Sequence, residues 1–99
     1  MVWWMKVLVD EMLDGWDLKL RHMGYDAHSM KKIKGEHGLN DDNSMIGYAR
    51  ENGMILVTRD TRCGRDCWAV DVPCILLDDA KIFKMCLAEL GKMKPAGGD

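Results

Sequence analysis

The sequence predicts an α/β domain with a central sheet of about four parallel strands. Short apolar runs alternate along the chain with segments whose apolar residues recur at helical spacing. The apolar runs lack the polar alternation of a half-exposed strand, which is typical of strands buried on both faces. Alternation of strand and helix favours a parallel sheet with right-handed crossovers. We therefore expect a compact three-layer domain with helices on both faces of the sheet.

The first predicted strand lies at residues 5–9, a β-branched apolar run that ends on Asp10 and Glu11. One helical face is expected to follow, and Gly24 should end that helix because glycine adopts the left-handed C′ conformation at little cost. The apolar residues of this face are Leu13, Trp16, Leu20 and Met23. Residues 25–28 are expected to form a short second strand.

The middle of the chain is expected to hold a loop and then a helix. Residues 29–41 are polar, basic and glycine-containing, which favours a loop. Consecutive cap-type side chains from Asn40 to Ser44 then predict the start of a helix, and Gly53 should end it. Met45, Ile46 and Ala49 are expected to point inward from this helix.

A third strand is predicted at residues 54–57, directly before Thr58-Arg59-Asp60. A loop through Gly64 should follow, with a turn of helix at residues 66–69. Residues 72–77 are the fourth predicted strand, and a last helix follows. The expected apolar face of this helix is Ile82, Phe83, Cys86, Leu87 and Leu90.

The composition is that of one small globular domain. With 99 residues we expect a single domain over residues 1–94 and a flexible tail at residues 95–99. No apolar run approaches the ~18–20 residues needed to cross a bilayer. No signal peptide is apparent, and the four cysteines lack zinc-ribbon spacing, so a reduced cytoplasmic protein is expected. The net charge of −2 disfavours a protein that coats nucleic acid by bulk electrostatics.

Three separate segments are expected to bring acids to one edge of the sheet. Asp10 follows the first strand, Asp60 follows the third, and Asp42 opens the middle helix. In open α/β sheets, ligands bind beyond the carboxyl ends of the strands, where strand order reverses. Each acid also has a purely structural interpretation, because Asp10 and Asp42 could cap helices and Asp60 could form a turn. The functional interpretation rests on their joint placement.

Acids gathered in this way suit a hard divalent cation. Mg²⁺ takes oxygen ligands and usually keeps several waters, whereas close carboxylates without a cation repel one another. A bound cation can position water and stabilise a phosphoryl group during in-line displacement. Arg59 and Arg62 could hold substrate phosphates, since a guanidinium binds phosphate bidentately, although solvated surface charge is the simpler interpretation.

Several motifs resemble a known family. They are Val-Leu-Val-Asp10-Glu11, the Gly24-Tyr-Asp segment, Asp41-Asp42 leading into Tyr48-Ala-Arg-Glu-Asn-Gly53, and Ile55-Leu-Val-Thr-Arg-Asp60. Together they are similar to the small PIN-like domains, relatives of the toxin nucleases of prokaryotic toxin–antitoxin pairs. The resemblance covers roughly residues 5–79. It implies a Rossmann-like PIN fold and Mg²⁺- or Mn²⁺-dependent cleavage of RNA.

The resemblance also implies roles for individual residues. Asp10, Asp42 and Asp60 match the family's metal-binding acids, with Asp41 as an alternative to Asp42. Asp66 is the candidate for a fourth metal ligand. Asp78 and Glu11 are further candidates for that ligand.

The competing functions differ in class. The first is a metal-dependent endoribonuclease with Arg59 and Arg62 at the substrate, which could be a toxin with an antitoxin protein as partner and could form a homodimer. The second is a catalytically inactive PIN-like binding module. A response-regulator-like phosphoacceptor domain is a third, but the chain is short for that fold and lacks a lysine at the usual place after a late strand.

Overall fold

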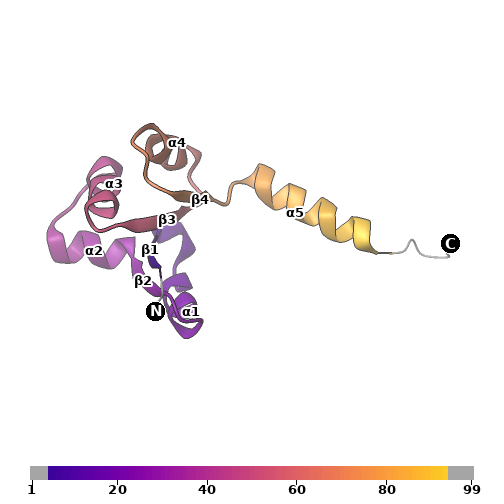
Figure 1. Ribbon diagram of the computed structural model, residues 1–99, viewed down its shortest axis with the longest axis horizontal. Helices are drawn as coiled ribbons and strands as arrows, with labels where there is room; N and C mark the ends of the chain where they lie inside the picture. The colour runs from indigo at the N-terminus through magenta and orange to yellow at the C-terminus, as the bar shows by residue number, and fades with distance from the viewer. Residues whose placement is uncertain (1–4, 94–99) are drawn as a thin grey trace.

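The computed structural model describes residues 5–93, apart from the side chain of Asp42, so the predicted tail at residues 95–99 lies outside it. The described residues form a sheet of four strands, β1 (Lys6–Val9), β2 (Asp26–Ser29), β3 (Met54–Thr58) and β4 (Cys74–Leu76), in the order β2-β1-β3-β4. All three strand pairs are parallel. The predicted α/β class and four-stranded parallel sheet are thus confirmed (Figure 1).

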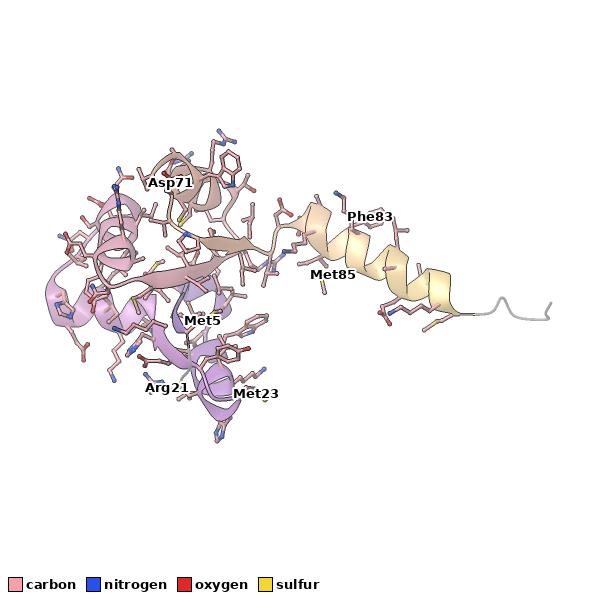
Figure 2. The ribbon with its side chains drawn as sticks, in the orientation of Figure 1. Met5, Arg21, Met23, Asp71, Phe83 and Met85 are labelled. Carbon is pink, nitrogen blue, oxygen red and sulfur yellow. The ribbon has the colours of Figure 1, made fainter. Side chains whose placement is uncertain are left out.

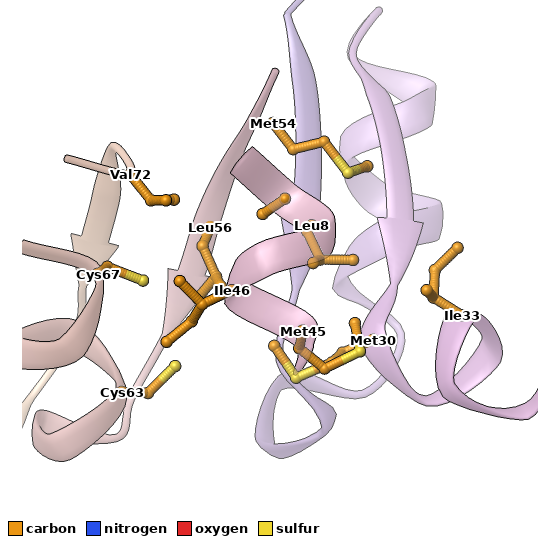
Figure 3. Close-up of a cluster of buried hydrophobic side chains, with 11 residues drawn as sticks. Leu8, Met30, Ile33, Met45, Ile46, Met54, Leu56, Cys63, Cys67 and Val72 are labelled. Atoms are coloured by element: carbon orange, nitrogen blue, oxygen red, sulfur yellow. The ribbon is translucent and has the colours of Figure 1, made fainter. Parts of the chain in front are cut away.

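Helices cover both faces of the sheet. A short 3₁₀ helix, η1 (Glu11–Leu13), and α1 (Trp16–His22) lie on one face. The other face carries α2 (Met30–His37), α3 (Asp42–Glu51) and α4 (Thr61–Ala69). Strand residues alternate between two buried clusters, since Val7, Val9 and Val57 face η1, whereas Leu8 and Leu56 face the three-helix side (Figure 3).

The predicted loop at residues 29–41 is wrong, because most of it forms α2. The hydroxyl of Ser29 accepts a hydrogen bond from the amide of Lys32 (3.4 Å) and caps the helix. Met30 and Ile33, spaced three residues apart, are buried against the core. Gly38 ends the helix with a φ of +66°. The buried face of α2 consists of Met30 and Ile33 alone, and the charged residues between them make it hard to recognise in the sequence.

The first predicted helix is interrupted. Gly15 adopts a φ of +86° and separates η1 from α1. Leu13 is buried and Leu20 packs beside it. Trp16 and Met23 were expected to lie in the core, but their side chains are 37% and 76% exposed. The turn at Gly15 rotates the following helix and turns these two side chains away from the sheet.

Gly64 lies inside α4, where a loop was expected. A methyl group at this position would lie 3.2 Å from the Leu76 side chain, so glycine allows α4 to approach β4 closely. Cys63 and Cys67, one turn apart, are buried in the same helix face. The glycine therefore serves packing and does not mark a loop.

The last predicted helix is present as α5 (Asp79–Lys92), but it is not packed. It extends away from the sheet and the other helices (Figure 1), and every one of its residues is exposed. Cys86, expected in the core, is among them. The radius of gyration of 16.3 Å exceeds the roughly 13 Å usual for this length. None of the helices in residues 5–93 is long and apolar enough to span a bilayer.

Candidate functional site

The carboxyl ends of β1 and β3 lie side by side, and this brings Asp10 and Asp60 to one edge. Val9 pairs with Val57 in register, and the amide of Asp10 continues the ladder by donating to the carbonyl of Val57 (2.9 Å). Strand order also reverses here, because the chain goes from β1 outward to β2 and then returns to β3 on the other side of β1. Asp10 and Asp60 thus follow neighbouring strands at the point of reversal, where ligands bind in open α/β sheets.

A buried threonine joins the two acids. Thr58, the last residue of β3, has no exposed surface. Its hydroxyl donates a short hydrogen bond to Oδ2 of Asp10 and accepts one from the backbone amide of Asp60 (3.0 Å). One hydroxyl group therefore sets the position of both acid-bearing segments. Thr58 is not among the predicted site residues, although it stands inside the Val-Thr-Arg-Asp motif.

Both acids are also helix caps, so the structural interpretation holds beside the functional one. Oδ1 of Asp10 accepts a hydrogen bond from the amide of Met12 (3.3 Å) and caps η1. Oδ1 of Asp60 accepts from the amide of Arg62 (2.9 Å) and caps α4. These bonds lock the rotamers of both carboxylates, which remain partly exposed at the edge.

Lys34 pairs with a residue that follows β1, and its charge also acts on the residue that caps α3. Its ammonium group pairs with Glu11, which follows Asp10 (2.9 Å). The backbone amide and hydroxyl of Ser44 hold the pKa of Asp41 below its usual value, and the nearby charge of Lys34 lowers it further. Lys34 therefore lies between the end of β1 and the start of α3. The structure thus links the third predicted segment to the first.

Within this segment the cap residue is Asp41, whose Oδ1 accepts a hydrogen bond from the amide of Ser44 (2.7 Å). Asp42, the predicted ligand, is the first residue of α3, and its side chain lies outside the described part of the molecule. Helix capping, the structural role considered for Asp42, is thus performed by Asp41. Asp10 and Asp60 are helix caps as well, so this role does not exclude Asp41. Asp42 stays the candidate ligand that the resemblance to PIN-like domains implies, with Asp41 as its alternative.

The candidates for a fourth acid differ in their places, and Glu11, which follows Asp10, is paired with Lys34. Asp66 is half-buried on α4, six residues after Asp60 and so about 9 Å along the helix axis. Asp78 caps α5 by accepting a hydrogen bond from the amide of Lys81 (2.9 Å). Among the side chains that the structure describes, no three His, Cys, Asp or Glu residues are close enough to hold a metal ion together. Asp10 and Asp60 are thus the best-placed pair, and Mg²⁺ needs only one or two protein carboxylates beside its waters.

The predicted phosphate-binding arginines differ in their surroundings. Arg59 donates from Nε to the carbonyl of Leu77 (3.3 Å) and pairs through Nη2 with Asp79 (3.0 Å), so it joins the end of β3 to the start of α5. Arg62 is exposed in the first turn of α4. An open depression of about 410 Å³ lies at this edge. It is lined by Met12, Arg59, Thr61, Asp78, Asp79 and Ala80.

Comparison with known proteins identifies one family. The model of the Mut7-C RNAse domain matches residues 5–93, which include every described strand and helix. Neither the curated proteins nor the solved structures gave a match.

Proposed function

Because the chain belongs to the Mut7-C RNAse domain family, we propose that it hydrolyses RNA phosphodiesters with Mg²⁺ or Mn²⁺ bound beside Asp10 and Asp60. The family is one of PIN-like, ribonuclease-type domains, in agreement with the resemblance seen in the sequence. The observation that carries the proposal is the hydroxyl of Thr58, which joins Asp10 to the segment of Asp60 at the reversal of strand order. A rigid pair of carboxylates at that place suits a hard cation.

In this proposal Asp10 and Asp60 bind the ion, and Asp42 and Asp66 are the further candidate ligands. When bound, the cation would neutralise charge on the phosphoryl oxygens and favour in-line attack by water. The protein's part is to hold the carboxylates in fixed rotamers. Asp10 meets this need through two hydrogen bonds, one on each carboxylate oxygen.

Substrate contact is assigned to the arginines that follow β3. Arg62 is exposed next to Asp60 and would bind a phosphate of the RNA bidentately. Arg59 is already paired with Asp79, whose side chain is 97% exposed. A solvent-exposed pair of this kind is worth little, so a phosphate can replace Asp79 as the partner of Arg59. We propose both arginines as substrate-binding residues on this basis.

The proposal extends to a biological role. The resemblance to toxin nucleases supports a toxin whose activity a partner antitoxin would block. An inactive binding module is the second candidate function, and one observation favours it. The described side chains contain no preformed group of three potential metal ligands. Metal affinity separates the two functions, since a binding module has no need of a Mn²⁺ site.

The test is cleavage of a mixed single-stranded RNA pool by the purified chain, with Mn²⁺ or with EDTA. Asp10→Asn is compared with wild type, and Glu51→Gln, an exposed acid at the far end of α3, is the matched control. We expect cleavage that requires the metal, disappears in Asp10→Asn and persists in Glu51→Gln. If wild type neither cleaves RNA nor binds Mn²⁺ in calorimetry, the nuclease proposal is wrong and the binding module stands.

A further inference from the structure

The helix α5 has an apolar face without a partner in the described part of the molecule. At 100° per residue, five of its residues fall within about 140° of the helix circumference. These residues, here called the α5 stripe, are Ile82, Phe83, Cys86, Leu87 and Leu90. Phe83 is 62% exposed and Leu90 58%. An isolated helix of this length is marginally stable in water, so α5 requires a surface to pack on.

The sheet has an apolar area that suits this helix. On the face of η1 and α1, the main contacts of α1 are with β2 and β1. The register places Ile55 beside Val7, and Ile75 beside Val57, on that same face. Ile75 is 43% exposed, and Ile55 and Leu77 are half-buried. These three residues, Ile55, Ile75 and Leu77, are called the open strip below.

In the described structure α5 does not cover the open strip of its own chain, since all its residues are exposed. Only Leu77 and Asp78 separate β4 from α5. Asp78 caps the helix, and Arg59 holds both Leu77 and Asp79. Figure 2 shows α5 pointing away from the sheet, with Phe83 and Met85 on this helix far from the labelled residues of the domain. The apolar stripe and the strip that could receive it therefore lie apart within one molecule.

We propose that two copies of this chain associate by exchanging α5, so that the α5 stripe of each copy covers the open strip of the other. Such an exchange is two-fold symmetric and isologous, which is the commonest arrangement of homodimers. Burying half-exposed Leu, Ile and Phe side chains from both helices and both strips removes on the order of 1,500 Å² from water, within the range of specific interfaces. The exchange gives α5 the packing surface that it lacks.

The first test is the mass of the full chain in solution by analytical ultracentrifugation over a wide range of concentration. Wild type is expected to have twice the chain mass of 11.3 kDa at high concentration. Leu90→Glu on the α5 stripe should give monomers. Ala88→Glu adds the same charge to the opposite side of the helix and should leave the dimer intact. A monomeric wild type, or a dimer that survives Leu90→Glu, overturns the proposal.

A second test distinguishes exchange from closure within one chain. Cys86 lies on the α5 stripe, and Ile75→Cys would place a thiol on the open strip. Mild oxidation of Ile75→Cys should join two chains, seen as a dimer on a non-reducing gel. Adding Cys86→Ser should abolish that product. A cross-link confined to single chains would show that α5 folds back on its own sheet. Neither outcome depends on nuclease activity, so this proposal and the proposed function can fail separately.

Discussion

The hydroxyl of Thr58 donates a hydrogen bond to the carboxylate of Asp10, which lies 48 residues earlier in the chain. The same hydroxyl accepts from the amide of Asp60, so it is satisfied as donor and as acceptor in a fully buried position. A buried hydroxyl with such partners is costly to remove, because the groups that it contacts lose their bonds. Substitution of Thr58 is therefore a direct test of the site.

We expect Thr58→Val to weaken both the metal site and the fold. Valine keeps the shape but leaves Oδ2 of Asp10 without its donor, so Mn²⁺ affinity should fall about 10–100-fold. The free energy of unfolding should fall by about 1–3 kcal/mol. Calorimetric titration with Mn²⁺ and urea unfolding measure the two effects. Thr58→Ser retains the hydroxyl and should bind Mn²⁺ nearly as wild type does, whereas equal affinities in Thr58→Val and wild type would contradict the role given to Thr58.

The adjacent acids of the third segment can be separated by substitution. Asp41→Asn should retain the helix cap, since asparagine caps as well as aspartate, and should leave Mn²⁺ binding unchanged. Asp42→Asn should reduce Mn²⁺ binding, because it removes the carboxylate that we assign to the site. Circular dichroism confirms that both variants fold. The reverse order of effects would transfer the role of ligand to Asp41.

The close approach of α4 to β4 predicts opposite effects for the same substitution at two helical glycines. Gly64→Ala places a methyl group 3.2 Å from Leu76, and we expect a loss of about 1 kcal/mol in the free energy of unfolding. Gly47→Ala in α3 meets no atom within 4 Å and should gain about 0.5–1 kcal/mol from helix propensity. Urea unfolding compares them. A stabilising Gly64→Ala would show that Leu76 moves aside freely.

The buried thiols predict a loss of stability at alkaline pH. Burial raises the pKa of Cys67, and the neighbouring Cys74 and Cys63 raise it further. Burial also raises the pKa of Cys74, although Cys67 and Lys81 partly oppose the shift. Below about pH 8.5 the thiols are protonated in both the folded and the unfolded state. Above that pH they ionise first in the unfolded chain, so the free energy of unfolding should fall by up to about 1.4 kcal/mol per thiol per pH unit.

The measurement is urea unfolding between pH 7.5 and pH 10, about the range over which free thiols titrate. Cys67→Ala removes one of the titrating groups, so its stability should decrease less steeply with pH than that of wild type, whatever its stability at pH 7.5. Parallel pH profiles for the two proteins would show that Cys67 does not contribute to the alkaline loss.

The sequence predicts the sheet well because its strands are continuous apolar runs. The start of α3 is also evident, since consecutive cap-type side chains precede it. By contrast, α2 has only Met30 and Ile33 to reveal its buried side. In α4, the residue type of Gly64 favours a loop. In the structure this glycine serves packing, because it lacks a side chain and so lets α4 approach Leu76 closely. Residue type alone does not show what a glycine contacts.

The site was predictable where it depends on strand order and hidden where it depends on side-chain partners. Asp10 and Asp60 could be placed together because each follows an apolar strand, and neighbouring parallel strands end at one edge. The role of Thr58 depends on the register of β1 and β3, which the sequence does not specify. The pairing of Arg59 with Asp79 at the start of α5 joins residues 20 positions apart, and the sequence does not show it. The α5 stripe was visible in the sequence, but its surroundings were not.

The long separation between Asp10 and Thr58 has a consequence for synthesis of the protein. The ribosome releases Asp10 well before Thr58, so the nascent chain carries an acid-bearing β1 whose neighbour β3 does not yet exist. The two carboxylates come to one edge only when β3 has paired with β1. A truncated product that ends before β3 therefore contains Asp10 without the hydroxyl that orients it, and the proposed nuclease site cannot form before β3 has been synthesised.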